Sequence, residues 1–251
     1  MGRWILAAIV AAISAVAPAH AAKSGAADVA AAINDPARPD ADRNLDQYRK
    51  PAEMLMFAGV RPGMRVMDLM PGGGYFTRLF AKAVGPKGYV YPLEVTQYDT
   101  FYDGKPAPIF AVAREYPNVS VIHAPIENIV APESLDLVWT SQNYHDMHNA
   151  FMGPADMAKV NKGVFDALKP GGIYIVLDHA AAPGSGIRDT NTLHRIDEEV
   201  VKTEVEAAGF KLVAESKVLR NASDMHTLKV FNPEIRHKTD QFILKFRKPA
   251  K

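Results

Sequence analysis

Side chains able to do acid–base chemistry gather in two short segments of this 251-residue chain. The first segment reads Gln142-Asn-Tyr-His-Asp-Met-His148, and the second is the dipeptide Asp178-His179. His145 is the first candidate for a general base, because imidazole titrates near neutral pH and the adjacent Asp146 could bias it. The neighbours Asn143 and Tyr144 are the other candidates to act in catalysis. The alternative is that His145 is a hydrogen-bonded structural residue, and the sequence leaves both interpretations open.

The same two segments offer a second chemistry, the ligation of a divalent metal. Nitrogen and oxygen ligands are available from His145, Asp146, His148, Asp178 and His179. Because imidazole is a poor ligand for magnesium, zinc, manganese or iron would fit better. We do not favour this interpretation, and no residue is assigned as a metal ligand. The chain has no cysteine, which excludes disulfides and thiolate chemistry.

A glycine-rich turn indicates where a ligand could approach the backbone. The apolar run that starts at Val66 leads into Pro71-Gly-Gly-Gly-Tyr75 and then into a helical pattern. Glycines let a ligand come close, and the start of a helix offers free N–H groups. Glu94 follows twenty residues after Gly74, where an acid can accept hydrogen bonds from ribose hydroxyls. Thr77 replaces the third glycine of a dinucleotide fingerprint, which favours a mononucleotide-type ligand over NAD. An ordinary turn followed by a surface glutamate remains the alternative.

These segments must be positioned by the elements between them. Strands are expected over residues 65–70, 89–93, 119–123, 135–140, 173–178, 210–219 and 242–247. Helical patterns separate the first five, which predicts a parallel sheet with helices on both faces. We expect one helix from Asp42 to a turn at Arg61-Pro62-Gly63, another over 193–208, and a turn at Lys169-Pro-Gly-Gly172. The long loop before the last strand could cover a pocket.

Composition and the N-terminal segment limit which partners and which domain organisation are possible. The formal net charge of +1 argues against a nucleic-acid partner, since such surfaces need clustered Lys and Arg. Residues 1–21 combine Arg3, an apolar stretch and the triplet Ala19-His20-Ala21, which is typical of a cleaved secretory signal. We therefore expect an exported protein, in the bacterial periplasm, that is not held at a membrane after cleavage. Residues 22–41 are expected to form a leader and linker, and residues 42–251 the single folded domain.

The series of motifs resembles the class I S-adenosylmethionine-dependent methyltransferases. Their D-x-G-x-G-x-G turn reads here Asp68, Met70, Gly72, Gly74, with the first glycine missing and Pro71 in the turn. Ala124-Pro-Ile-Glu127 stands at the adenine-contact position, and Leu168-Lys-Pro-Gly-Gly172 precedes the fifth strand. More narrowly, the chain is similar to a bacterial group of exported proteins described only as predicted methyltransferases.

The resemblance implies a Rossmann-like α/β fold, whose sheet has seven mostly parallel strands and an antiparallel last strand. It also implies S-adenosyl-L-methionine as the cofactor. Its binding residues would be Asp68, Gly72, Gly73, Gly74, Tyr75, Glu94 and Glu127. Among them Glu94 would hold the ribose, Glu127 the adenine edge, and Tyr75 would either pack beside the sulfonium or simply pack on a neighbour. Arg49 and Lys50 could close over the cofactor carboxylate or form a solvated face.

The expected reaction is methyl transfer to an unidentified small-molecule acceptor. The loop after the fourth strand lacks the Asn/Asp-Pro-Pro-Tyr pattern of nitrogen-directed enzymes, which makes a nucleobase acceptor less probable than a small molecule or an oxygen. The alternative is an exported, non-catalytic ligand-binding protein with the same fold. An NAD-type oxidoreductase is disfavoured by Thr77.

Overall fold

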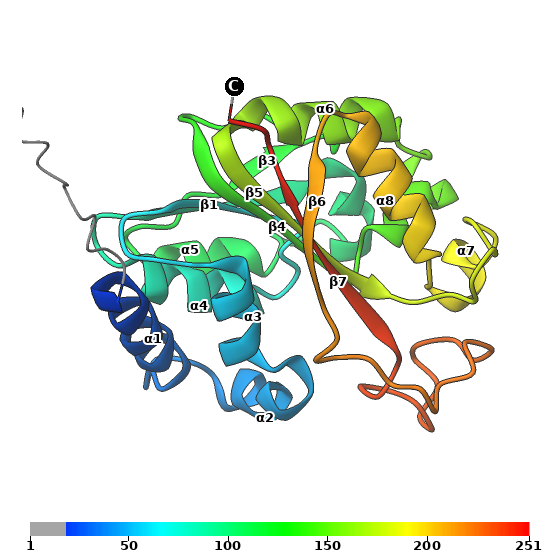
Figure 1. Cartoon of the computed structure of the whole chain (residues 1–251), viewed down its shortest axis with the longest axis horizontal. Coiled ribbons are helices and arrows are strands. Elements are labelled where there is room, and N and C mark those ends of the chain that lie inside the picture. The colour runs from blue at the N-terminus through cyan, green and yellow to red at the C-terminus, as the bar shows by residue number, and fades with distance from the viewer. Residues whose placement is uncertain (1–18, 251) are drawn as a thin grey trace, which may run out of the picture.

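The computed structural model describes residues 19–250, with helices packed on both faces of a central sheet (Figure 1). Residues 1–18 of the expected signal segment lie outside the described residues. The helices are α1 (Ala19–Ile33), α2 (Asp40–Arg49), α3 (Pro51–Ala58), α4 (Tyr75–Val84), α5 (Ile109–Glu115), α6 (Met157–Ala167), α7 (Thr190–Leu193) and α8 (Glu198–Ala207), with short 3₁₀ turns η1 (Thr96–Tyr102), η2 (His145–His148) and η3 (Ala150–Met152). No helix within residues 19–250 is long and apolar enough to cross a membrane.

The sheet confirms the fold class expected from the sequence. Its strands are β1 (Arg65–Leu69), β2 (Tyr89–Val95), β3 (Ile122–Ala124), β4 (Leu135–Ser141), β5 (Leu168–His179), β6 (Lys211–Ser216) and β7 (Gln241–Arg247). They lie in the order β3-β2-β1-β4-β5-β7-β6. The pairs among β1 to β5 are parallel, and β7 runs antiparallel to both β5 and β6. Strands β2 and β3 lie on one side of β1, and β4 to β7 lie on the other side. The strand order therefore reverses at β1.

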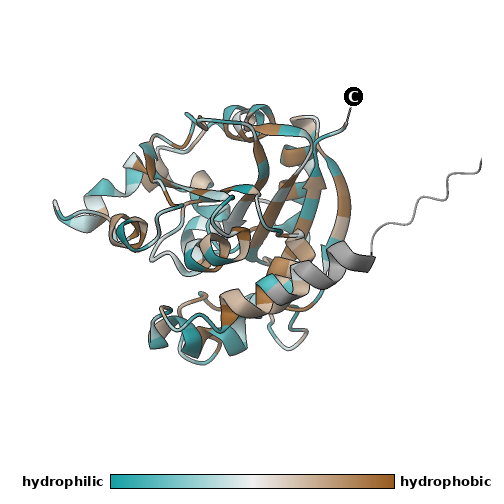
Figure 2. Ribbon diagram, turned by 90° about the vertical axis from the view of Figure 1, so that its left-hand side faces the viewer, coloured by the Kyte–Doolittle hydropathy of each residue, from teal (hydrophilic) through white to brown (hydrophobic). Residues whose placement is uncertain are grey.

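Alternating side chains on each strand build two separate cores. In β4, Leu137 and Trp139 join the core under α1, α3, α4 and α5, while Val138 joins the core under α6 and α8. Successive strand residues point to opposite faces, so both faces must be apolar for helices to cover each of them. Figure 2 shows this as hydrophobic colouring along the central strands and on the helix faces that meet them. The sheet is therefore buried on both sides.

In the N-terminal part of the chain, α1 lies mostly in the expected leader region, and the single helix expected after it is divided into two. Helix α1 packs on the domain, with Val29 and Ala32 buried in the same core as α4. The helix expected from Asp42 is divided into α2 and α3, because Lys50 takes a left-handed conformation (φ 47°) and Pro51 begins the next helix. Proline suits the first position of a helix, where its missing N–H costs no hydrogen bond.

The helix expected over 193–208 is also divided. Helix α7 ends at His194, which has a positive φ of 55°, and α8 begins after Asp197. The Asp197 side chain accepts a hydrogen bond from Glu199 N (3.1 Å), as an N-cap residue does. Two further expected boundaries differ from the structure. Strand β3 starts at Ile122, and the expected turn at Lys169–Gly172 lies inside the long strand β5.

The long loop between β6 and β7 is tied to the domain by one buried cation. Arg195 donates to Leu228 O (3.0 Å), to Ala180 O (2.9 Å) and to Asp224 Oδ1 (3.1 Å). Asp224 in turn accepts from the backbone N of Asp240 (2.7 Å). A buried charge is tolerated when it is paired and hydrogen-bonded in this way. The loop is held close to the carboxyl ends of the strands.

Candidate ligand-binding site

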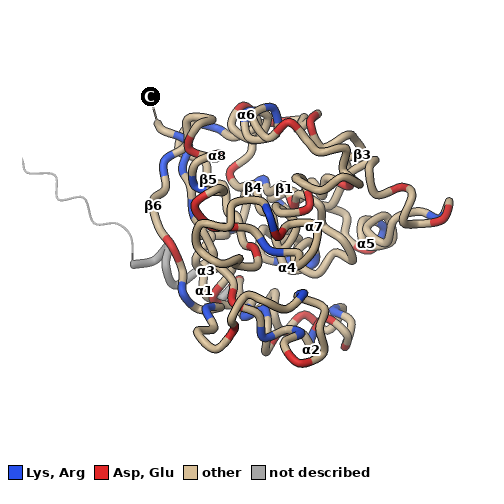
Figure 3. Tube along the Cα trace, turned by 90° about the vertical axis from the view of Figure 1, so that its right-hand side faces the viewer, with Lys and Arg blue, Asp and Glu red and all other residues tan. Residues whose placement is uncertain are grey.

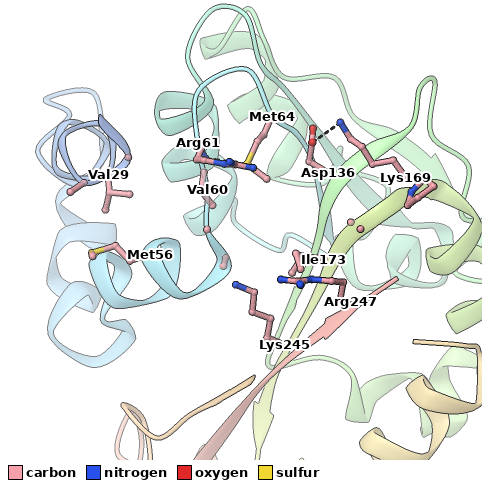
Figure 4. A pocket seen from close by; sticks show the side chains of 17 residues that line it. Val29, Met56, Val60, Arg61, Met64, Asp136, Lys169, Ile173, Lys245 and Arg247 are labelled. Carbon is pink, nitrogen blue, oxygen red and sulfur yellow. Dashed lines mark hydrogen bonds and ion pairs between the residues drawn. The ribbon is translucent and has the colours of Figure 1, made fainter. Parts of the chain in front are cut away.

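Among the cavities in the described part of the chain, two lie at opposite ends of the central strands. The larger, about 610 Å³, is lined by α1, by Arg61 and Met64 before β1, and by Lys169, Lys245 and Arg247 (Figure 4). The smaller, about 340 Å³, opens where β1 and β4 end. In open α/β sheets, ligands bind outside the carboxyl ends of the strands, at the point where the strand order reverses. The smaller cavity occupies that position, and it is also where the polar segments meet.

The glycine turn forms one wall of this cavity. Gly72 and Gly73 line it, and a Cβ built on either would meet no atom within 4 Å, so their backbone is open to a ligand. Gly74 serves packing instead, because a Cβ there would lie 2.9 Å from Val112 Cγ2. Asn143 holds the turn in place, donating from Nδ2 to Met70 O (2.7 Å) and accepting from Thr140. Asn143 therefore positions the turn as well as lining the cavity.

Asp68 sits at the floor of the cavity with an unusual protonation equilibrium. Its carboxylate is buried at the end of β1 and accepts a hydrogen bond from Thr77 Oγ1 (2.6 Å). Burial raises the pKa of Asp68 to about 7, against the lowering effects of the Thr77 hydrogen bond and the Arg49 charge. A cationic ligand group beside Asp68 would favour the ionised form. Thr77, which replaces the third glycine of the dinucleotide fingerprint, therefore stabilises the Asp68 carboxylate by a hydrogen bond.

Arg49 lines the same cavity and carries a positive charge. Its guanidinium lies over the Tyr75 ring, 4.6 Å from the centroid, and has no hydrogen bond or ion pair to any residue in the described part of the chain. Tyr75 is fixed because its hydroxyl donates to Asp46 Oδ1 (2.6 Å). Asp46 is itself clamped by buried Arg38 (2.6 and 2.9 Å). Burial lowers the pKa of Arg49, so an anion would stabilise it. One face of the Tyr75 ring is thus taken by Arg49.

Glu94 is close to the site but covered. It is fully buried near the end of β2, and its Oε1 accepts a hydrogen bond from Tyr102 of η1 (2.9 Å). Its Oε2 is buried without a hydrogen-bond partner among residues 19–250. Such an orphaned acceptor is costly and points to an additional donor. Glu94 itself does not line the cavity, whereas Tyr98, in the same segment η1 as Tyr102, does.

Glu127 is placed apart from the cavity. It is exposed, and its Oε1 accepts from the backbone N of Asp156 (2.8 Å) just before α6. The neighbouring Ile126 N donates to Gln97 Oε1 (3.2 Å) near η1. The cavity as the structure has it does not reach Glu127, and the geometry gives its expected adenine contact no support.

The two polar segments meet through His145. Its Nδ1 lies 2.8 Å from Asp178 Oδ1, and its backbone N donates to Asp178 Oδ2 (2.8 Å). The other ring nitrogen, Nε2, lies 3.2 Å from Asp146 Oδ1 and 3.2 Å from His194 Nδ1. Asp146 is also a cavity-lining residue. The segments after β4 and β5 thus come together as expected, and His194 joins them.

This environment keeps a proton on His145. Burial opposes the charged ring, but the Asp178 charge and the hydrogen bonds to Asp146 and Asp178 raise the pKa of His145 to about 10. A general base must be unprotonated at the working pH. The protein alone therefore favours an imidazolium, which counts against the expected role of His145 as a proton acceptor.

Other expected residues have structural surroundings. Tyr144 is in the core, where its hydroxyl donates to Glu204 Oε2 (2.8 Å) and accepts from Asn161 Nδ2 (2.9 Å). His148 pairs with the same glutamate (3.3 Å). Burial lowers the pKa of His179 to about 3, so it is a neutral partner of Thr239. None of these three lines the cavity, and the expected catalytic role of Tyr144 has no support in the geometry.

Comparison with known proteins finds similarity to methyltransferases. No protein-family model matches it. It is 27% identical to the ubiquinone/menaquinone biosynthesis C-methyltransferase UbiE of Vibrio cholerae over 185 residues, 68% of this chain. The chain is related to the S-adenosylmethionine-dependent methyltransferases. A methyltransferase structure from Aquifex aeolicus shares the fold with a TM-score of 0.56 at 17% identity, covering 81% of this chain and 98% of that one.

The relationship has limits that matter for function. The chain spans 63% of the length of the Vibrio relative. The [4+2]-cyclase SpnF has the same fold, with a TM-score of 0.57 at 19% identity over 84% of this chain and 82% of that one. A related fold therefore accompanies a different chemistry in at least one protein, and activity must be argued from the site.

Proposed function

We propose that the protein binds S-adenosylmethionine in the cavity beside β1 and transfers its methyl group to a small-molecule acceptor. One observation carries the proposal: Asp68 and Arg49, of opposite charge, face the same cavity at the glycine turn. The amino-acid end of the cofactor has an ammonium and a carboxylate, which match these two charges. The relationship to named methyltransferases supports the same ligand.

The residues present fit this cofactor at its amino-acid end. Gly72 and Gly73 leave the backbone open, Asp68 would hold the ammonium and Arg49 the carboxylate. Glu94 has the unpaired Oε2 that a ribose hydroxyl would satisfy, provided that η1 shifts. The bound cofactor would supply a methyl group on a positively charged sulfur. The chain's own task is to orient both reactants and exclude water.

An acceptor with a flat apolar part suits the rim of the cavity. Tyr98 lines the cavity, and its ring stands beside Phe101 (5.6 Å) and Phe151 (6.1 Å). Both phenylalanines are exposed to solvent. Exposed aromatic rings next to a pocket are unusual in a monomer surface and are typical of binding sites. Figure 3 shows basic and acidic residues interspersed along the chain, and such a mixed surface fits a neutral small molecule better than a polyanion.

Calorimetric titration of the metal-stripped protein with S-adenosylmethionine and with S-adenosylhomocysteine tests the proposal. We expect binding of both ligands, and at least tenfold weaker binding by Arg49→Met, since a charged hydrogen bond contributes about 1.5–3 kcal/mol. Lys50→Met is the matched control, because Lys50 is adjacent but does not line the cavity. Glu94→Gln should also weaken binding, whereas Tyr102→Phe removes the hydroxyl that competes for Glu94 and should not.

No heat with either ligand up to millimolar concentration would overturn the cofactor assignment. Binding without turnover of any tested acceptor would instead favour a ligand-binding protein that keeps the fold. Equal weakening by Arg49→Met and Lys50→Met would show that only the general field of the helix matters, which would contradict the assigned role of Arg49.

We also propose that the protein is exported. The support is the N-terminal pattern of Arg3, an apolar stretch and Ala19-His20-Ala21. Sequencing the N-terminus of the protein recovered from the periplasm and the cytosol of its host checks this. A first residue at Ala22 in the periplasmic fraction is expected, and an intact Met1 found only in the cytosol would contradict it.

A further inference from the structure

His145, Asp146 and His194 form a compact group that the proposed methyl transfer does not use. One ligand atom from each, His145 Nε2, Asp146 Oδ1 and His194 Nδ1, lies within 4.8 Å of the others. The three separations are 3.2 Å between the two ring nitrogens, 3.2 Å from His145 to Asp146, and 3.6 Å from His194 to Asp146. The group comes from two segments that are far apart in the sequence.

These separations match the edges of a metal coordination sphere. Zinc bonds to nitrogen and carboxylate oxygen are about 2.0–2.2 Å long. In a tetrahedron, two such ligand atoms lie about 3.3–3.6 Å apart, which follows from that bond length and the tetrahedral angle. The observed 3.2, 3.2 and 3.6 Å fall around this value. One face of a tetrahedron is therefore already assembled.

The surroundings orient the ligands as a metal site requires. Asp178 is fully buried and lies 2.8 Å from His145 Nδ1, so it fixes the ring with Nε2 turned to the group. Metal-binding histidines usually have a carboxylate or carbonyl behind them in this way. His194 is held at φ 55°, and its ring packs on Phe231 (4.9 Å between centroids). Left-handed backbone at a non-glycine residue is strained and is often found at functional sites.

The group is closed on one side and open on the other. The His145 side chain is 2% exposed, whereas those of Asp146 and His194 are 15% and 21% exposed. Asp146 lines the cavity beside β1, and Tyr98 donates to its second oxygen (3.3 Å). Three protein ligands with an open fourth position are typical of catalytic rather than structural zinc sites. The open position would face the cavity.

We propose that His145, Asp146 and His194 bind one divalent transition metal ion, with zinc as the best match. On binding, the ion displaces the proton that the metal-free protein holds on His145, so metal binding releases a proton. Two imidazoles and one carboxylate suit zinc or iron(II) and suit magnesium poorly. The open position takes water or an oxygen of the ligand in the cavity. Metal binding does not depend on the proposed methyl transfer, but the delivery of an acceptor oxygen to the open position rests on it. From the sequence, metal binding after β4 and β5 was an alternative that we did not favour. The ligand set expected for that alternative lacked His194 and included His148, Asp178 and His179.

Metal titration of the full-length, chelator-treated protein tests the site directly. We expect one Zn²⁺ per chain by competition calorimetry, and with Co²⁺ the intense visible absorption of a four-coordinate ion. His194→Gln should lower Zn²⁺ affinity at least a hundredfold, and Asp146→Asn should do the same. His148→Gln is the matched control, because His148 lies in the same turn but pairs with Glu204. Asp178→Asn should lower affinity 10–100-fold while leaving all three ligands in place.

Circular dichroism and unfolding midpoints of each variant identify any loss of affinity that is caused by misfolding. Zn²⁺ affinity that is equal in the wild type and His194→Gln would overturn the proposal, and so would a loss caused by His148→Gln alone. Because these titrations contain no cofactor, they separate the two proposals. Zn²⁺ binding without S-adenosylhomocysteine binding would retain the metal site and reject the cofactor, and the reverse result would reject the metal site alone.

Discussion

The affinity for S-adenosylhomocysteine should depend on the protonation of Asp68. In the free protein, burial raises the pKa of this carboxyl to about 7, so about half of the molecules are protonated at neutral pH. The proposed ligand presents an ammonium to Asp68, which only the carboxylate can hold. Binding therefore selects the ionised form and releases the proton from the molecules that carry it.

The size of the effect follows from that pKa. With a pKa of about 7, roughly one molecule in eleven is ionised at pH 6 and ten in eleven at pH 8. Affinity should thus rise about tenfold between pH 6 and pH 8, equivalent to about 1.4 kcal/mol. At pH 7, about half a proton should be released for each ligand bound.

Calorimetry at pH 6, 7 and 8, repeated in buffers of different ionisation enthalpy, measures both quantities. Thr77→Val is the informative variant, because it removes the hydrogen bond that lowers the pKa of Asp68. Its affinity profile should move to higher pH. Affinity that stays constant from pH 6 to pH 8, or proton uptake on binding, would refute the assigned role of Asp68.

The same pKa shift affects stability without ligand. A buried acid with a raised pKa stabilises the folded state below the unfolded pKa of about 4, and this contribution is lost as the pH rises through 7. Thermal unfolding of wild type and Asp68→Asn between pH 5 and pH 8 should therefore converge at low pH and diverge at high pH, with the variant more stable at pH 8. Parallel curves would contradict this.

Three further changes test the packing around the site. Gly74→Ala should lower the free energy of unfolding by about 2–4 kcal/mol in urea titrations, because φ is 80° and the new Cβ would lie 2.9 Å from Val112 Cγ2; a change below 0.5 kcal/mol would contradict the geometry. Arg195→Met should cost about 3–5 kcal/mol by leaving Asp224 as an unpaired buried charge, and adding Asp224→Asn should restore part of it in a double-mutant cycle. Val29→Ala should cost about 1.5 kcal/mol if α1 belongs to the domain, and an unchanged unfolding midpoint would show that it does not.

The strands of the sheet could be predicted from the sequence, because the signals for strands are local and repeated along the chain. Apolar runs such as 65–69 and 135–141 are buried on both faces. Each run is followed by residues that favour a turn, such as the glycines after β1. Element boundaries were harder to predict. The break at Lys50 depends on a left-handed residue before Pro51, and the break at His194 depends on the cap that Asp197 provides. Periodicity carries no information about either conformation.

The site was only partly predictable for a similar reason. The sequence identified Asp68, the glycine turn and His145, because each lies at or just after the carboxyl end of a strand. It ranked Arg49 as a solvated residue, since nothing local indicates that α2 folds over the glycine turn through Asp46 and Tyr75. The protonated state of His145 depends on Asp178, thirty-three residues away, and could not be deduced from its neighbours in sequence.

The position of β7 controls when the fold can be completed. This strand follows the other six strands of the sheet in the chain, yet it lies between β5 and β6 and pairs with both. Until residue 247 is available, β6 has no partner and the β5 edge stays unpaired. Pairings between distant segments are slow to form, and unpaired strand edges in an incomplete sheet are prone to aggregation. The sheet can therefore close only after residue 247 has been synthesised, and until then the unpaired edge of β5 is open to pairing with another chain.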